Sequence, residues 1–311
     1  MTGGASGARF LTTLPYTRRA AWMERAEIVD AIRVVRRAGS HEAVVLNGSV
    51  RTDQLAAALV ARRRTRPAVV LADATWKDGG RARRAAVRAI DHRDAHYCVL
   101  SQAEATLFPA TWGVAPERVH VTPFHWVLDE SEVEEVPDTD GTIFAGGDSL
   151  RDYRPLLEAA EGLAAGVTIA SRSRAPARAP ANVTIGELNQ RRYEERFRAA
   201  SIVVVPLTPR RDRSAGQQTY LNAMVLGKPV VVTDAVGVRD YVADRRTGLI
   251  VPPGDATAMR AALDWLLDPA NAGEVRAIGE RARAVALERF GPEQYVRRLV
   301  EVVDLALAAR E

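Results

Sequence analysis

A polar turn that leads into a helix is the most chemically suggestive feature of the carboxyl-terminal half of the sequence. Gly216 is followed by Gln217, Gln218 and Thr219, and then by the largely apolar residues 220–226. The first N–H groups of a helix have no partner within the helix, and the helix dipole adds partial positive charge there. We therefore expect these four residues to bind an anionic group such as a diphosphate, with no metal ion required.

A second glycine-containing turn lies earlier in the same half. Gly146 and Gly147 follow the apolar residues 142–145, and Arg151 comes four residues later. Glycine lets the backbone approach a ligand closely, and the planar guanidinium of arginine matches phosphate oxygens. A Gly-Gly pair alone is equally typical of a tight turn. Together with the helix start at Gly216, the pair favours a phosphate site to which Arg151 contributes a cation.

The elements that would position these turns are short strands alternating with helices. The predicted strands cover residues 10–14, 43–46, 68–71, 97–100, 119–121, 142–145, 167–170, 183–185, 202–206 and 229–233, and the predicted helices cover residues 19–37, 52–63, 81–90, 153–163, 190–200 and 217–226. This βαβ rhythm predicts parallel sheets covered by helices, an α/β fold. In such sheets ligands bind beyond the carboxyl ends of the strands.

An acidic, turn-rich segment at residues 127–141 divides the chain, and we interpret it as an interdomain linker. The sequence thus predicts a first domain at 1–136 and a second domain, which carries both glycine-containing turns, at 137–290. Beyond residue 255 the chain is helical, with a break near Phe290-Gly291-Pro292. We expect residues 291–311 to form a helix that packs back across the domain junction.

Polar residues follow the predicted strands of the first domain and form a candidate substrate cleft: Asn47, Ser49, Asp73, Thr75, Ser101 and His125. Asp73 either orients an acceptor hydroxyl as a catalytic group or caps the segment that follows it. His125, between Phe124 and Trp126, either faces the cleft or is a packed structural residue.

Composition excludes several other classes of protein. The net charge is only +4, so nucleic acid is not indicated, and the chain has no apolar run long enough to span a membrane. Cys98 is the single cysteine, which excludes a disulfide within the chain. We expect a cytoplasmic enzyme without a metal or cofactor. The helix bearing Arg81, Arg83, Arg84 and Arg88, with Lys77 before it, favours a solvated face and leaves open peripheral docking on anionic lipid at the inner membrane face.

The sequence LNAMVLGKPVVVTDAVGVRDYVADRRTGLIVPPGDATAMRAALDWLL, at residues 221–267, resembles the donor domain of retaining GT-B glycosyltransferases of the family-4 type. The segments GVAPERVHVTPF, FAGGDSLRDYRPLLEAA and NVTIGELNQRRYEERFRAASIVVVPL are similar to other parts of that family. The resemblance covers about residues 95 to 295. It implies two Rossmann-like domains whose parallel sheets face a central cleft, with an acceptor-binding domain at 1–136 and a nucleotide-sugar-binding domain at 137–290. The cleft residues of the first domain are then expected to bind the acceptor.

The resemblance also implies residue roles. In the family, two glutamates with seven residues between them bracket the phosphate loop, one near the donor sugar and one on the ribose. The matching positions here are Ser214, at the catalytic position, and Asn222, so both carboxylates are replaced. Asn222 can still hydrogen-bond a ribose hydroxyl. The loop Gly186-Glu187-Leu188 is expected to border the nucleobase. The family's arginine after the glycine is Gly147 here, so Arg151 stands in, with Arg172, Arg211 and Arg213 as further candidate cations.

The resemblance and the two turns together predict a hexosyltransferase-like enzyme. We expect it to bind a UDP- or GDP-linked sugar and to transfer the sugar to a small-molecule or lipid-linked acceptor without a metal, with retention of configuration. The loss of both glutamates and the short first domain favour an alternative, a non-catalytic GT-B partner or regulatory subunit. A nucleotide-sugar epimerase is a third, weaker interpretation.

Overall fold

The computed structural model of the chain describes residues 23–64, 66–76, 80–135, 137–172, 179–208 and 213–310. The chain divides into two compact units. The first unit comprises Met1–Val99, Phe108–Thr122 and Leu299–Glu311, and the second comprises Leu100–Leu107 and Pro123–Arg298. The predicted strand at 10–14, Lys77 and Arg211 lie outside the described residues.

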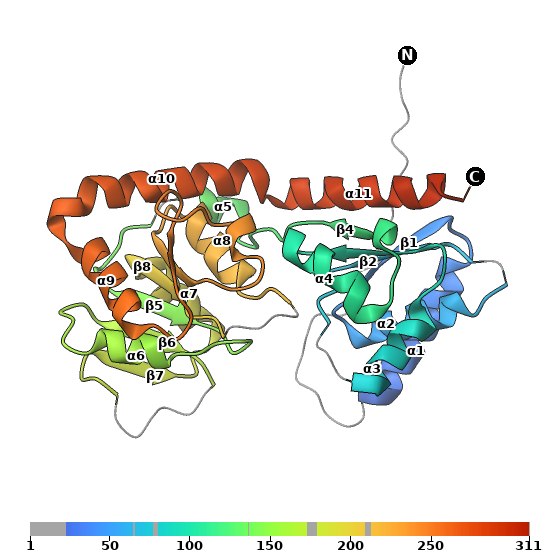
Figure 1. Cartoon of the computed structure of the whole chain (residues 1–311), viewed down its shortest axis with the longest axis horizontal. Helices are drawn as coiled ribbons and strands as arrows, with labels where there is room; N and C mark the ends of the chain where they lie inside the picture. The colour runs from blue at the N-terminus through green and yellow to red at the C-terminus, as the bar shows by residue number, and fades with distance from the viewer. Residues whose placement is uncertain are drawn as a thin grey trace, which may run out of the picture. The chain divides into compact units, whose positions relative to one another are not determined.

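The first unit is built on a parallel sheet whose strands lie in the order β1-β2-β3-β4 (Figure 1). These strands are β1 (Ala43–Asn47), β2 (Ala68–Ala72), β3 (Ala95–Val99) and β4 (Val119–Val121). Its helices are α1 (Met23–Ala38), α2 (Arg51–Ala61) and α3 (Gly80–Ile90), the end of α4 (Gln102–Trp112), a 3-10 turn at Pro116–Arg118 and most of α11 (Pro292–Ala308). Every residue of β2 and β3 is buried, as the uninterrupted apolar run of β2 predicts.

An aromatic cluster fills the core of the first unit. The Trp76 ring centroid lies 5.8 Å from that of Tyr97, 5.4 Å from that of Phe108 and 5.6 Å from that of Trp112. The Trp76 indole donates a 2.6 Å hydrogen bond to the carbonyl of Gly48. This bond joins the loops that follow β1 and β2, which both start at the carboxyl edge of the sheet.

The second unit contains a six-stranded parallel sheet in the order β10-β9-β8-β5-β6-β7. The strands are β5 (Ile143–Gly146), β6 (Val167–Ala170), β7 (Val183–Gly186), β8 (Ile202–Val205), β9 (Val230–Thr233) and β10 (Leu249–Val251). The chain builds outward from β5 to β7, then returns to β8 beside β5 and builds the other way. The carboxyl ends of β5 and β8 therefore flank a topological switch point, where such sheets bind ligands.

Helices and two hydrophobic clusters cover the second sheet. The helices are α5 (Glu130–Glu134), α6 (Arg154–Ala160), α7 (Gln190–Ala199), α8 (Gln217–Val225), α9 (Ala256–Leu267) and α10 (Ala272–Arg289), with 3-10 turns at Val238–Asp240 and Pro269–Asn271. The predicted break before the last helix is confirmed, because α10 ends at Arg289 and α11 begins at Pro292. No helix in the described ranges is long and apolar enough to cross a membrane.

The acidic segment at 127–141 differs from the structureless linker that the sequence predicted. It contains α5, which begins with a capping box formed by Asp129 and Glu132. Val133 on this helix is buried in a hydrophobic cluster of the second unit. The segment therefore belongs to the second unit, and the pattern of an aspartate followed three residues later by a glutamate was the local signal for it.

Candidate functional site

Arg151 joins the two turns that the sequence singled out. Its guanidinium donates to the carbonyls of Gly146 at 3.2 Å and Ser149 at 2.8 Å, and to Thr219 Oγ1 at 3.2 Å. Gly146 ends β5, whereas Thr219 lies in the first turn of α8. Burial lowers the pKa of Arg151, since the charged form loses solvation. The structure thus places a desolvated cation beside a helix amino terminus, an arrangement suited to a diphosphate.

Glycine is required at both turns. Gly216, the N-cap of α8, has φ +86°, and a Cβ there would lie 2.9 Å from Val205 Cγ1. Gly147 has φ +107°, and a Cβ there would lie 3.1 Å from Arg151 Nη2. Residues other than glycine rarely adopt these positive φ angles, and a glycine has no Cβ to hold the backbone away from the guanidinium. The Arg151 side chain therefore lies close to the backbone of three glycines: Gly146, Gly147 and Gly216.

Two of the further candidate cations are described by the structure: Arg172 is ion-paired with Asp148, and Arg213 lies beside the loop after β5. Arg172 pairs with Asp148 at 2.6 Å, and Asp148 also accepts from Ser171 Oγ at 2.8 Å. Burial opposes ionisation of Asp148, but the hydrogen bonds from Arg172 and Ser171 outweigh it and lower its pKa. Arg213 Nη2 lies 3.5 Å from Ser149 Oγ, at the rim of the β5 loop. Arg151 contacts both turns directly through its guanidinium.

Asn222 lies on α8, one helical turn beyond Thr219. Its Oδ1 accepts a 2.9 Å hydrogen bond from the backbone N–H of Val127, so Nδ2 is the group that could donate to a ribose hydroxyl. Gly186 ends β7, an edge strand of the sheet, and Glu187 and Leu188 lie between β7 and α7. Leu188 packs against the hydrophobic cluster of the second unit, which fixes this loop.

Ser214 makes a contact that the sequence did not predict. Its N–H donates to Glu104 Oε1 and its hydroxyl to Glu104 Oε2, both at 2.8 Å. Glu104 is 4% exposed and Ser214 is also 4% exposed. Gln217 Nε2 in turn donates to Ser214 Oγ. The residue that replaces a family glutamate is therefore bonded to a carboxylate from a distant segment of the chain, within the second unit.

Candidate acceptor residues of the first unit lie at the carboxyl edge of its sheet. Asp73 follows β2 with φ +51°, an uncommon backbone conformation outside glycine that is frequent in turns and functional loops. Asn47 Oδ1 accepts from Ser49 N–H at 2.9 Å and from Ser49 Oγ at 2.6 Å, so these two side chains form one turn. Thr75 N–H donates to the carbonyl of Asp73 at 2.7 Å.

The other two acceptor candidates belong to the second unit. Ser101 is fully buried, and its hydroxyl donates to Glu104 Oε2 at 3.0 Å. His125 stacks on Phe124 and lies 4.8 Å, ring to ring, from Tyr295. Its Nδ1 also lies 2.7 Å from the carbonyl of Trp126. These contacts give both residues structural roles, which sequence reasoning left open for His125.

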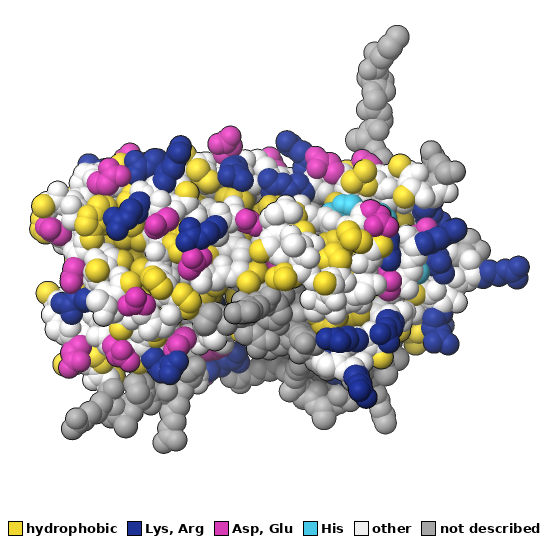
Figure 2. Space-filling model, in the orientation of Figure 1, with side chains coloured by type: hydrophobic (Ala, Val, Ile, Leu, Met, Phe, Trp, Pro, Cys, Tyr) yellow, Lys and Arg dark blue, Asp and Glu magenta, His cyan; other side chains and the backbone are white. Residues whose placement is uncertain are grey.

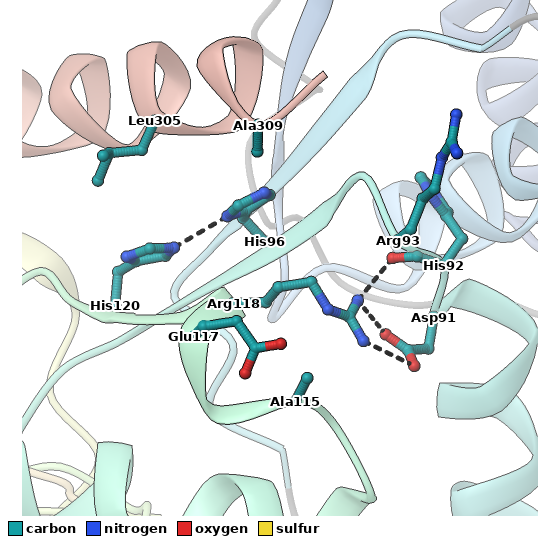
Figure 3. A pocket seen from close by; sticks show the side chains of 10 residues that line it. All are labelled: Asp91, His92, Arg93, His96, Ala115, Glu117, Arg118, His120, Leu305 and Ala309. Carbon is teal, nitrogen blue, oxygen red and sulfur yellow. Dashed lines mark hydrogen bonds and ion pairs between the residues drawn. The ribbon is translucent and has the colours of Figure 1, made fainter. Parts of the chain in front are cut away.

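A separate pocket of about 730 Å³ lies in the first unit, on the side of the sheet where β3 and β4 begin (Figure 3). The stacked rings of His96 and His120 face it, with Nδ1 of one 2.9 Å from Nε2 of the other. Burial, with the nearby His120 and Arg118, lowers the pKa of His96 to about 4. Leu305 and Ala309 of α11 line the same pocket. It stands apart from the strand ends where the acceptor candidates lie.

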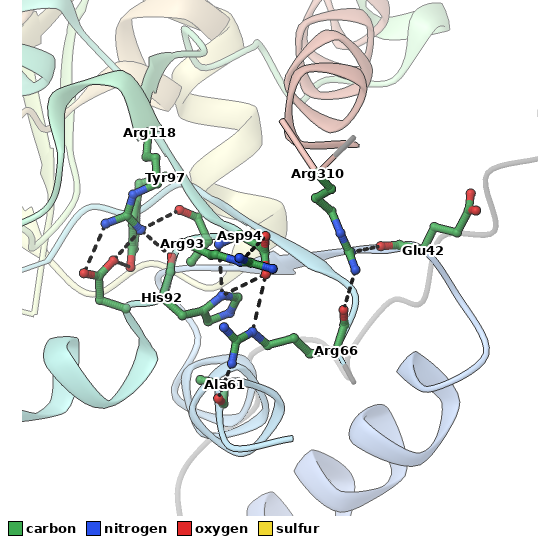
Figure 4. Close-up of polar contacts among 11 residues, drawn as sticks. Glu42, Ala61, Arg66, His92, Arg93, Asp94, Tyr97, Arg118 and Arg310 are labelled. Carbon is green, nitrogen blue, oxygen red and sulfur yellow. Dashed lines mark hydrogen bonds and ion pairs between the residues drawn. The ribbon is translucent and has the colours of Figure 1, made fainter. Parts of the chain in front are cut away.

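A polar network next to this pocket ties the end of the chain to the first unit (Figure 4). Arg310 donates to the carbonyls of Glu42 and Arg66, both at 2.9 Å. Arg118 forms a bidentate pair with Asp91 at 2.6 and 3.2 Å. These residues are saturated by structural contacts, so the network stabilises the fold of this unit.

The basic helix of the first unit divides into two sets of side chains. Arg83 turns inward, where it donates to Gln54 Oε1 at 3.0 Å and lies over the Trp76 ring. Arg81, Arg84 and Arg88 are exposed. In Figure 2, basic side chains gather at the lower right, over α3 and its neighbours. The solvated face that the sequence favoured therefore consists of these three arginines.

Comparison with known proteins agrees with this architecture. Residues 142–269 match the family described as Glycosyl transferases group 1. No curated protein sequence matches the chain. A Rickettsia africae glycosyltransferase superposes with a TM-score of 0.68 at 13% identity, over 95% of this chain and 84% of that one. Sucrose-phosphate synthase from Thermosynechococcus elongatus gives 0.68 at 17% identity, over 94% and 81%.

The HepE protein of Anabaena, in a complex with UDP-glucose, gives a TM-score of 0.67 at 16% identity, over 89% of this chain and 82% of that one. These likenesses establish the fold, and the matched family covers the six-stranded unit from β5 to the end of α9. The superpositions confirm the predicted GT-B fold, and the family match of residues 142–269 supports the predicted glycosyltransferase. The chain thus has the GT-B fold, and its residues 142–269 match the family of group 1 glycosyl transferases.

Proposed function

We propose that the chain transfers a sugar from a uridine or guanosine diphosphate sugar to a small-molecule or lipid-linked acceptor. The observation that carries this proposal is the position of Arg151, which contacts both the loop after β5 and the first turn of α8. A diphosphate at this point would meet helix N–H groups, the helix dipole and a desolvated cation together. UDP is favoured as the nucleotide because HepE, a protein of similar fold, was crystallised with UDP and UDP-glucose.

In this proposal the protein contributes positioning and electrostatics. Arg151 and the start of α8 stabilise the leaving diphosphate, so its charge is balanced by protein groups without a metal ion. Asn222 Nδ2 donates to the ribose, and the loop after β7 borders the base. Asp73, with its unusual backbone conformation, orients the acceptor hydroxyl. Retention of configuration follows if the chemistry is that of the family that residues 221–267 resemble.

The experiment that tests this proposal is a binding panel followed by a turnover assay. UDP, GDP, ADP and TDP are compared by the shift in melting temperature that each causes, because a ligand that binds the native state raises apparent stability. The sugar derivatives of the active nucleotide are then tested for slow hydrolysis. A selective shift with release of free sugar is the expected result. Tight nucleotide binding without any turnover, or no binding at all, would favour the partner-subunit alternative; conversion to a second sugar nucleotide would favour an epimerase.

A further inference from the structure

Glu104 is a buried carboxylate to which the proposed reaction gives no role. It accepts hydrogen bonds from Leu100 N–H at 3.1 Å and Ser101 Oγ at 3.0 Å, and from both the N–H and the hydroxyl of Ser214 at 2.8 Å. The local sequence Ser101-Gln-Ala-Glu104 is typical of a helix cap, and Glu104 N–H does donate to Ser101 Oγ at 3.2 Å. A cap explains the bonds near residue 100, but not the two to Ser214.

The segment that bears Glu104 is held firmly against the second unit. Gln102 N–H donates to Asp240 Oδ2 at 2.6 Å, and the Tyr241 hydroxyl donates to the carbonyl of Leu100. A Cβ on Gly237 would lie 2.7 Å from Ser101 Cβ and 2.9 Å from Ser214 Cβ, so the loop after β9 closes tightly over both serines. Glu104 therefore sits where this loop and the turn before α8 meet.

We propose that Glu104 is a positioning residue for donor binding, because its carboxylate fixes Ser214 and thereby the turn that opens α8. The inference rests on the proposed function, since it assumes that α8 binds the diphosphate. Ser214 Oγ accepts a hydrogen bond from Nε2 of Gln217, the first residue of α8, so fixing Ser214 also fixes the start of this helix. Glu104 thus brings a carboxylate against position 214, where the family that the chain resembles has a glutamate of its own. A preorganised turn keeps the N–H groups of α8 aimed at the diphosphate before the donor arrives.

The test compares Glu104→Gln with Asp94→Asn. Asp94 is a matched control, because it is 7% exposed and ion-paired with Arg66, but lies in the first unit at the amino end of β3. Isothermal titration with UDP and kinetics with the active donor are measured at equal fractions of folded protein. We expect Glu104→Gln to weaken UDP binding about tenfold and to lower kcat about 100-fold, the size of effect that misplacement by about 1 Å produces. Asp94→Asn should change neither quantity.

An exchange of the two side chains separates a positional role from a general loss of stability. The double variant E104S/S214E exchanges the two side chains, so a carboxylate at position 214 faces a serine at position 104. Its kcat should be at least tenfold higher than that of Glu104→Gln. Wild-type UDP affinity and kcat in Glu104→Gln would refute the inference while leaving the proposed function intact, whereas a wild-type protein that binds no nucleotide would refute the proposed function. If Glu104→Gln does not fold, Ser214→Ala decides: a fall in UDP affinity supports the inference, and unchanged affinity overturns it.

Discussion

Substitution of Arg151 by methionine tests where the diphosphate binds. Arg151 is partly buried, and its guanidinium contacts two backbone carbonyls and the Thr219 hydroxyl, all of them neutral acceptors. Its desolvation, which lowers the pKa of Arg151, is a cost of the unliganded state that an anionic ligand would offset. Removing one hydrogen-bonding partner of a charged ligand typically costs about 2 kcal/mol. The expected loss in UDP affinity is therefore about 30-fold.

The assay is isothermal titration of wild type, Arg151→Met and Arg151→Lys with UDP, UMP and uridine. The loss should be largest for UDP, smaller for UMP and absent for uridine, because only the phosphates meet residue 151. Lysine keeps the charge but not the forked geometry, so it should give an intermediate loss. Equal losses for UDP and uridine would show that Arg151 supports the fold of the site and not the diphosphate. Unchanged UDP affinity in Arg151→Met would refute the placement altogether.

Three further predictions concern individual residues. Gly216→Ala should destabilise the second unit by about 1 to 2 kcal/mol in urea unfolding, because φ is +86° and the new Cβ would meet Val205; unchanged stability would contradict that geometry. Asp73→Asn should lower kcat at least tenfold without changing UDP affinity, since asparagine tolerates the backbone at φ +51° but cannot accept the hydroxyl proton; wild-type kcat would leave Asp73 a structural turn. The pKa of His96 is lowered from 6.5 to about 4 in the folded state, so the unfolded state binds more protons below pH 6.5. The His96 contribution to the free energy of unfolding is therefore fully present above pH 6.5. It falls by about 3 kcal/mol as the pH is lowered toward 4. His96→Gln should flatten this acid limb in urea titrations at fixed pH, and an unaltered limb would exclude His96 as its source.

The strands were the most predictable part of this fold. Runs such as Val203-Val204-Val205 and Val230-Val231-Val232 are buried on both faces of the sheet, so their composition alone identifies them. The helix α4 was not predicted. It carries Pro109 internally and buries apolar residues that follow no clean helical period, and both properties hide a helix in a single sequence. Tertiary packing therefore determines this element more than local propensity does.

The two glycine-containing turns could be identified from the sequence because each is a short contiguous stretch. Gly216 and the polar residues after it are contiguous, and Gly146 to Arg151 is another short stretch. The two stretches meet because β5 and β8 are neighbours at the switch point of the sheet. The alternation of strands and helices predicts a parallel sheet, but it does not give the order of the strands within that sheet. Glu104 could not be assigned in this way. It is 110 residues from Ser214 in the chain, and its own sequence context indicates only a helix cap, with no local signal for the bonds to Ser214.

The turn before α8 lies between a partly buried arginine and a buried glutamate, which have different roles. Arg151 reaches the first turn of the helix through Thr219, whereas Glu104 holds the turn itself through Ser214. A carboxylate exposed beside a diphosphate would repel it, but Glu104 directs its oxygens at four protein donors and is 4% exposed. The negative group is therefore engaged by the protein, and the positive group and the helix dipole face the proposed ligand. Loss of a carboxylate at position 214 is, on this arrangement, compatible with an intact donor site, because a side chain from outside the donor motif restores the constraint on the turn.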